Sequence, residues 1–321
     1  NFDREITGQT QREDQTATSI GLFVQGDVEW FRGFRTSLGL RHDYLKLAID
    51  DRWLEDDEDG SGSRRFHENS GMLGVSYRLA PQRQLYANIG TAFESPTFTE
   101  FARPDGSSGF NPRLEPQETV SRELGMRGVL AGELEYDVAI FSADVRNEIL
   151  PFDQDGRTFY QNAGKTDRHG IEIGLGWTPA WPWRLTSALT LAEYQLDSFG
   201  DNSNNRMPGL PRQQWVNQLR WRSADRHYLS LETRYQGKVY AENSNQTQVN
   251  DYWLVHLRGG KSFRFGDQEL ELFAGIRNLL DEDYFSNIRI NANSDRPNPA
   301  DRGYFEPAPE RHFHAGAELS F

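Results

Sequence analysis

The acidic run "EDDEDG" contains the residue types of a cation site. Glu55, Asp57, Asp59 and Gly60 follow the spacing with which a calcium-binding loop opens. Such a loop needs a bidentate glutamate at its twelfth position, where this sequence has Phe66. We therefore interpret the run as a solvated acidic loop and predict no calcium site there.

Two histidines near the end of the chain are the other candidate metal ligands. His312 and His314 are two residues apart, so on a strand they would share one face. No third ligand is apparent, and we predict water-facing strand positions with no metal bound. The serines of "GSSG" at 106–109 lack a nucleophile elbow, and "GKT" at 164–166 lacks the glycines of a phosphate loop. The sequence predicts neither an enzyme nor a bound cofactor.

The composition excludes several classes of protein. The 48 acidic residues outnumber the 35 lysines and arginines, which argues against nucleic acid as a partner. The absence of cysteine excludes disulfides and thiolate metal sites. No apolar run approaches the roughly 18 residues of a membrane helix, and the mean hydropathy is -0.76. The chain begins with Asn1 and shows no leader, so we expect a mature or cut segment.

Hydrophobic residues alternate with polar ones along most of the chain. Ile171, Ile173 and Leu175 fall on one face of a strand, and Glu172 falls on the other. The same period of two recurs at 20–30, 38–44, 270–277 and 313–321. An outer apolar face and an inner polar face are typical of membrane β-barrels, whereas a soluble sandwich would bury its apolar face between two sheets.

The alternation divides the sequence into about 13 strands. They are predicted near 17–30, 33–48, 64–79, 83–95, 118–130, 133–149, 157–177, 182–197, 210–223, 226–240, 250–264, 268–280 and 310–321. Short connections alternate with longer ones at 49–63, 96–117, 150–156, 198–209, 241–249 and 281–309. Tight turns at one end and long loops at the other are the layout of outer-membrane barrels. The predicted fold is therefore an all-β, antiparallel transmembrane β-barrel.

Aromatic residues gather at the short turns. They form three groups, which are Trp30, Phe31 and Phe34; Trp177, Trp181 and Trp183; and Phe263 and Phe265. Membrane barrels place such residues in a girdle at the level of the lipid headgroups. Packing at strand ends is the alternative explanation, and we favour the girdle.

Several motifs resemble those of the TonB-dependent outer-membrane receptors of Gram-negative bacteria. The stretches are "GTAFESPTFTEF", "NPRLEPQETVSRELGMRG", "YQNAGKTDRHGIEIGLGW", "GIRNLLDEDYFSN" and the ending "PAPERHFHAGAELSF". Their order and spacing are similar to those of the family's barrel. One departure is Gln117, which stands where the family pattern has glutamate after Pro116, with Glu118 as the residue that could replace it.

The resemblance covers 1–321 but only part of a family member. These receptors are 22-stranded barrels with a plugged lumen, and the sequence shows no plug domain or TonB box. The resemblance implies that 1–321 is the C-terminal part of the barrel, with the plug and first strands absent. An open sheet edge in lipid leaves unpaired backbone groups, each costing several kcal/mol. We therefore expect the chain to be a segment of a longer protein.

The resemblance implies an outer-membrane receptor for energised uptake of a ferric siderophore or similar metal chelate. Its implied partners are the chelate, outer-membrane lipid, and the TonB, ExbB and ExbD proteins acting through the plug. Chelate pockets in the family use aromatic and cationic residues near the outer mouth. The candidates by position are Trp53, Phe110, Tyr160, Tyr240, Arg289 and Tyr304. Their alternative role is loop packing.

Other functions remain open at this point. A passive porin-like barrel, an adhesin-like barrel and a soluble all-β carbohydrate-binding module share the alternation. Within the family, haem, cobalamin and small redox cofactors are alternative cargoes.

Overall fold

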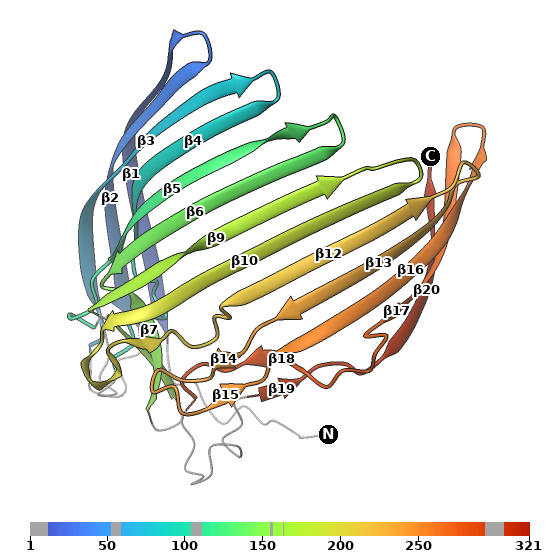
Figure 1. Cartoon of the computed structure of the whole chain (residues 1–321). Helices are drawn as coiled ribbons and strands as arrows, with labels where there is room; N and C mark the ends of the chain where they lie inside the picture. Colours follow the sequence, from blue (N-terminus) through green and yellow to red (C-terminus); the bar gives the residue numbers. More distant parts are fainter. Residues whose placement is uncertain (1–11, 53–58, 104–110, 155–156, 163, 293–304) are drawn as a thin grey trace, which may run out of the picture.

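Antiparallel strands of the computed structural model pair in chain order into one large sheet (Figure 1). The structure describes residues 12–52, 59–103, 111–154, 157–162, 164–292 and 305–321. The main path consists of β1 (Glu13–Phe31), β2 (Phe34–Asp51), β3 (Gly62–Ala80), β4 (Arg83–Glu94), β5 (Gln117–Leu130), β6 (Leu134–Arg146), β9 (Lys165–Trp177), β10 (Trp183–Ser198), β12 (Gln213–Arg222), β13 (His227–Gln236), β16 (Tyr252–Phe265), β17 (Gln268–Arg277) and β20 (His312–Ser320).

Short elements occupy the connections at one end of this sheet. They are three hairpins, formed by β7 (Ile149–Gln154) with β8 (Arg157–Asn162), β14 (Val239–Tyr240) with β15 (Gln248–Val249), and β18 (Phe285–Ile288) with β19 (Phe305–Pro307). A 3-10 helix (Gly200–Asn202) and β11 (Asn205–Arg206), which pairs with β10, lie between β10 and β12.

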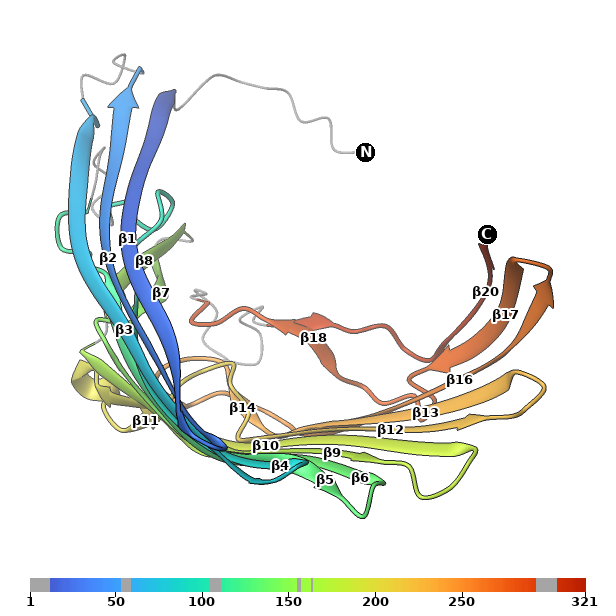
Figure 2. The ribbon, with the colours of Figure 1, turned by 90° about the horizontal axis from the view of Figure 1, so that it is seen from above.

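The sheet curves into an open arc, with β1 and β20 at its two ends (Figure 2). Strand β18 and the segments around it lie inside the arc, at the end that carries the long connections. The path of 13 strands agrees with the predicted number, and the arc confirms the predicted antiparallel barrel wall.

Strand alternation gives the sheet an apolar outer face. Ile171 and Leu175 are 41% and 39% exposed, and among the residues that the structure describes no second sheet covers them. The register continues this face across the strands, placing Ile171 opposite Ile140 and Leu191. A soluble sandwich would bury such a row, so the carbohydrate-binding module of soluble type is excluded by the architecture.

The inner face is polar over most of its length and is covered by loops at one end. The Tyr252 ring of β16 contacts the ring of Tyr284, which precedes β18, with 4.9 Å between the ring centroids and 40° between the ring planes. Because β18 lies inside the arc, this contact identifies the face that carries Tyr252 as the concave one (Figure 2). His312 and His314 share this face by register, as predicted.

The apolar outer face ends in a charged collar on the side of the long loops. Arg122 donates to Asp144 over 2.7 Å, and Lys165 lies 3.4 Å from Asp144 and 3.1 Å from Asp197. Arg122 lies only two positions from the exposed Leu124 on the same face. The strands therefore continue beyond the apolar band, as their lengths of up to 19 residues require.

Aromatic side chains border the apolar band on both sides. At the short turns Trp30 and Trp181 are 64% and 69% exposed, in agreement with the predicted girdle. A second group, which the sequence analysis did not single out, consists of Trp215, Tyr235 and Trp253 at the loop ends of β12, β13 and β16. The Trp253 ring centroid lies 4.9 Å from that of Tyr235 and 5.9 Å from that of Trp215.

One connection differs from its prediction. The strands expected at 133–149 and 157–177 are interrupted, because β6 ends at Arg146 and β9 begins at Lys165. Asn147 adopts a positive φ of 54°, and its N–H donates to the Gly164 carbonyl over 3.3 Å. This bond closes the connection and leaves β7 and β8 as a separate hairpin. The connection predicted at 150–156 is thus longer and contains the paired strands β7 and β8.

Candidate functional site

The stretch "GTAFESPTFTEF" leads from the barrel wall into a loop that folds onto the inner face. Strand β4 ends at Glu94, and Pro96, which has no N–H to pair, is buried two residues later. Phe101, only 1% exposed, then packs with Leu114 from the same loop against Leu47 and Phe66 of the wall. This small core holds the described parts of the segment between β4 and β5 on the inner face.

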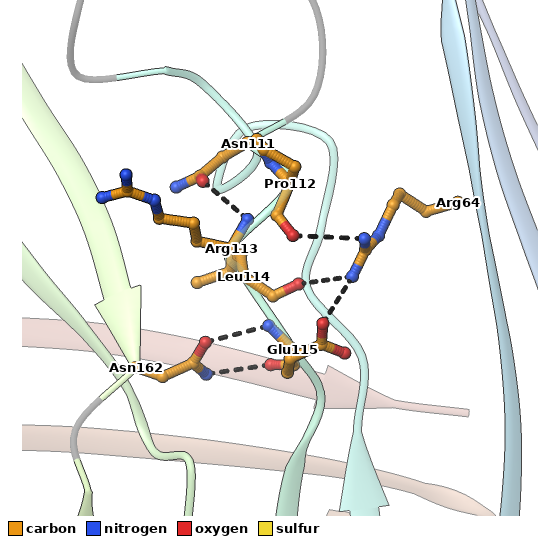
Figure 3. A network of polar contacts seen from close by, with 7 residues as sticks. All are labelled: Arg64, Asn111, Pro112, Arg113, Leu114, Glu115 and Asn162. Atoms are coloured by element: carbon orange, nitrogen blue, oxygen red, sulfur yellow. Dashed lines mark hydrogen bonds and ion pairs between the residues drawn. The ribbon is translucent and has the colours of Figure 1, made fainter.

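Arg64 fixes the "NPRLEP" segment to β3 (Figure 3). Its guanidinium donates to the carbonyls of Pro112 and Leu114 over 3.2 and 3.1 Å, and to the Glu115 carboxylate over 2.9 Å. Its charge also lies over the Phe66 ring, 5.4 Å from the centroid. A single cation therefore positions three residues of this loop against the inner wall.

Asn162 connects this segment to the β7–β8 hairpin (Figure 3). Its side-chain amide accepts the Glu115 N–H and donates to the Glu115 carbonyl, both over 2.9 Å. The same amide nitrogen donates to the Asn147 carbonyl over 2.6 Å. An aspartate could not replace this residue, because the two donated bonds require the amide.

The structure explains why glutamine stands at position 117, where the family pattern has glutamate. Its amide nitrogen donates to Glu94 over 2.7 Å, and its oxygen accepts the Ile149 N–H over 3.1 Å. A glutamate would place two carboxylates together. Glu118 does not take over this role, because it pairs with Phe93 and Arg146 on the opposite face.

We expect Gln117→Glu to loosen the loop between β4 and β5 by roughly 1–3 kcal/mol, because it removes a hydrogen bond and adds a like charge. Limited proteolysis of the 95–116 loop in the full-length protein measures the effect. The double variant Glu94→Gln with Gln117→Glu exchanges the two side chains, so one amide donor again faces one carboxylate acceptor. Its cleavage rate should therefore return to that of the wild type. A double variant as labile as the single one would contradict this account.

The "NLLDEDY" block forms the turn after β17 and fixes the last strand. Asn278, with a φ of 51°, accepts the Glu282 N–H over 2.9 Å and donates to its carbonyl over 2.8 Å. Asp281 accepts the Arg311 N–H over 2.8 Å and the Arg311 guanidinium over 2.9 Å. These interactions with Arg311 lower the pKa of Asp281, and the hydrogen bond from the Arg311 backbone N–H has the largest effect.

Asn291 joins three of the inner loops, and we call it the loop junction. Its backbone N–H donates to Ala241 and its side-chain amide to Pro151, both over 3.0 Å to a carbonyl oxygen. Its side-chain oxygen accepts the Asn243 N–H over 2.9 Å. The positive φ of 55° is one that asparagine tolerates. Apart from its place in the asparagine-rich stretch "INAN", the sequence pattern did not distinguish this residue.

The loop junction brings together the segments that carry three of the predicted ligand residues. Tyr240 precedes Ala241, Tyr160 is opposite Pro151 in the β7–β8 hairpin, and Arg289 lies two residues before the junction. Both tyrosines are half-buried, and Arg289 is exposed. These three remain predicted ligand residues. Trp53, Phe110 and Tyr304 lie outside the described residues.

The possible metal ligands are placed as follows. Asp59 accepts the Ser61 N–H over 2.9 Å, and the Ser61 side chain and N–H lower its pKa. Glu55 and Asp57 lie outside the described residues. Where the structure describes the chain, it contains no group of three or more His, Asp or Glu side chains able to hold a metal ion. Within the same residues, no helix has the length and apolar character to cross a membrane.

Comparison with known proteins gives a family match. The model of a family described as TonB dependent receptor-like, beta-barrel, matches residues 1–279. A probable TonB-dependent siderophore receptor, PiuA, of Acinetobacter baumannii is 22% identical over 292 residues, covering 85% of this chain and 38% of that protein. The vitamin B12 transporter BtuB of Vibrio vulnificus is 25% identical over 221 residues, covering 68% of this chain and 34% of that protein.

Comparison with solved structures shows the same fold in a transport receptor. The crystal structure of the ferric citrate transporter FecA in its unliganded form superposes with a TM-score of 0.79 at 16% identity, covering 98% of this chain and 47% of that one. The chain thus spans less than half the length of each of these three proteins.

Proposed function

Because the chain belongs to the TonB-dependent receptor β-barrel family, we propose that it is part of an outer-membrane receptor that takes up a scarce metal chelate. The family consists of outer-membrane transport receptors, not enzymes, for siderophores, metals or vitamin B12. We propose a ferric siderophore as the cargo and the Gram-negative outer membrane as the location. The family match over residues 1–279 is the observation that carries this proposal.

In this proposal the chain supplies the C-terminal part of the barrel wall and its outer loops. The apolar outer face would contact outer-membrane lipid, and the polar inner face would line the path of the cargo. Tyr160, Tyr240 and Arg289 would contact the chelate from the loops around Asn291, by stacking and charged hydrogen bonds. Trp53, Phe110 and Tyr304 complete the proposed ligand set.

Tight capture makes an energy source necessary. A nanomolar affinity corresponds to about -12.3 kcal/mol. At an association rate constant of roughly 10⁶ M⁻¹s⁻¹, release would take on the order of a thousand seconds. We propose that TonB with ExbB and ExbD supplies this work through a plug domain outside the present chain. A passive porin receives no support from the comparisons.

Growth of a deletion strain identifies the cargo. The strain is tested on a panel of ferric siderophores, haem and cobalamin, each as the limiting source of iron or cobalamin. We expect growth to fail on one ferric siderophore and to return when the full-length gene is supplied. Failure on haem or cobalamin alone would replace the siderophore with that cargo. Unchanged growth on every compound, together with swelling of liposomes containing the protein, would reject energised uptake in favour of a passive pore.

A further inference from the structure

A groove of about 560 Å³ crosses the outer face of the wall between β13 and β20. The apolar side chains in its lining are those of Leu229, Leu257, Ala274, Ile276, Phe313 and Ala315. Leu257 is five residues from the inner-facing Tyr252 on β16, so its side chain points to the outside. The groove therefore lies in the apolar outer face, across four strands that pair one after another (Figure 1).

The sheet register explains why this part of the outer face is hollow. Gly259, Ala274 and Ala315 are directly opposite one another and form one row across β16, β17 and β20. The next row on the same face consists of Leu257, Ile276 and Phe313. A row with almost no side-chain bulk beside a row of large side chains leaves a channel that runs across the strands.

Neither a plug domain nor further wall strands would cover this groove. A plug fills the lumen, which is on the opposite side of the sheet. Further strands would pair with β1 and β20 at the two ends of the path and extend the sheet sideways within the same layer. The centre of the groove, at Gly259 and Ala274, lies on β16 and β17, and each of these strands already has a partner on both sides.

Lys261 lies on the same outer face, beside the groove on the side of the short turn. It is directly opposite His227 on β13 and Leu272 on β17. Its Nζ lies 5.2 Å from the centroid of the Phe263 ring, so the side chain extends toward the turn between β16 and β17. Lysines near the edge of a membrane-spanning segment place their ammonium group at the level of the lipid headgroups in this way.

The charge of Lys261 is not neutralised by the described part of the chain, where no carboxylate lies within ion-pair distance of it. Glu271 of the neighbouring strand lies 3.2 Å from Arg258. Glu269 of the same strand lies 4.0 Å from Arg226. An ammonium group without a counter-charge at the membrane interface is suited to the phosphate of a lipid.

We propose that the groove and Lys261 form a binding site for one anionic phospholipid, with its phosphate on the lysine ammonium and an acyl chain in the groove. The short turns of outer-membrane barrels face the periplasm, so the lipid belongs to the periplasmic leaflet. The volume of the groove falls within the range of small-molecule sites. The site depends on the membrane location of the barrel and not on the proposed cargo.

Native mass spectrometry of the full-length protein in a neutral detergent tests the site with two probes. They are phosphatidylglycerol and a diacylglycerol with the same acyl chains, which lacks the phosphate. We expect one bound phosphatidylglycerol and about tenfold weaker binding of the diacylglycerol. Lys261→Gln removes the charge and Ala274→Phe fills the groove, so each should weaken phosphatidylglycerol binding about tenfold or more. Arg264→Gln is the matched control, because it removes a cation from the inner side of β16 and should leave binding unchanged.

Several results would overturn the proposal. Equal binding of the two probes, or no bound phosphatidylglycerol, would mean that the outer face contacts lipid without a defined site. Unchanged binding in Lys261→Gln or in Ala274→Phe, or equal weakening in Arg264→Gln, would have the same meaning. A dimer that excludes lipid from this face would assign the groove to contact between two copies of the protein. Binding is measured without any chelate, so the failure of the proposed cargo would leave this result unaffected.

Discussion

Arginine in place of Leu38 is expected to destabilise the protein in a bilayer by about 2–4 kcal/mol, which is the cost of a lipid-facing cation near the midplane. Leu38 is 52% exposed on the outer face, where its partner across the sheet is Leu73. The charge would have to leave water for hydrocarbon without a partner. Urea titration of the full-length protein in phospholipid vesicles measures the free energy of unfolding.

The adjacent residue provides the matched control. Ser37 precedes Leu38 on β2 but faces the inside, where it is hydrogen-bonded to Asp27. Ser37→Arg introduces the same side chain beside a carboxylate and water, so we expect a change of less than about 1 kcal/mol. If both variants lost the same stability, lipid would not lie against the outer face.

Asn291→Ala is expected to weaken chelate binding by roughly 10- to 100-fold, since two side-chain hydrogen bonds of about 1 kcal/mol each are lost and alanine is disfavoured at positive φ. The loss would separate the segments that carry Tyr160, Tyr240 and Arg289. Equilibrium binding of the cognate chelate to the full-length receptor, and its uptake rate, report the change.

Two further variants identify the cause. Asn291→Asp keeps the acceptor for the Asn243 N–H but loses the donor to Pro151, so it should have an intermediate effect. Asn287→Ala changes an exposed asparagine of β18 and should leave affinity unchanged. Wild-type affinity in Asn291→Ala would mean that the loop junction does not organise the binding site.

The alternation of side chains was sufficient to predict the wall of the barrel. A period of two is a local property, so the Ile171, Ile173 and Leu175 row could be assigned to one face without knowledge of its neighbours. Turn length is also local, which is why the tight turns and long loops were placed correctly. The prediction failed at 147–164, where the Asn147–Gly164 hydrogen bond closes a hairpin that periodicity does not reveal.

The candidate site was predictable only in part. Tyr160 and Tyr240 were chosen because they are aromatic and lie in loops, but these two properties do not indicate which loops are in contact. The decisive contact joins Asn291 to Pro151 across 140 residues of sequence. Polar loop residues do not follow a periodic pattern in the sequence. The contact between Asn291 and Pro151 is therefore set by how the loops pack against each other.

The sequence by itself determined the strands, their two faces and the end at which the loops lie, because each follows from neighbouring residues along the chain. Only the tertiary structure decided which loops meet at Asn291 and that Leu229, Gly259 and Ala274 share one row of the outer wall. The physical reason is register: pairing between strands sets which side chains are neighbours, and that pairing is a sum of contacts between distant parts of the chain.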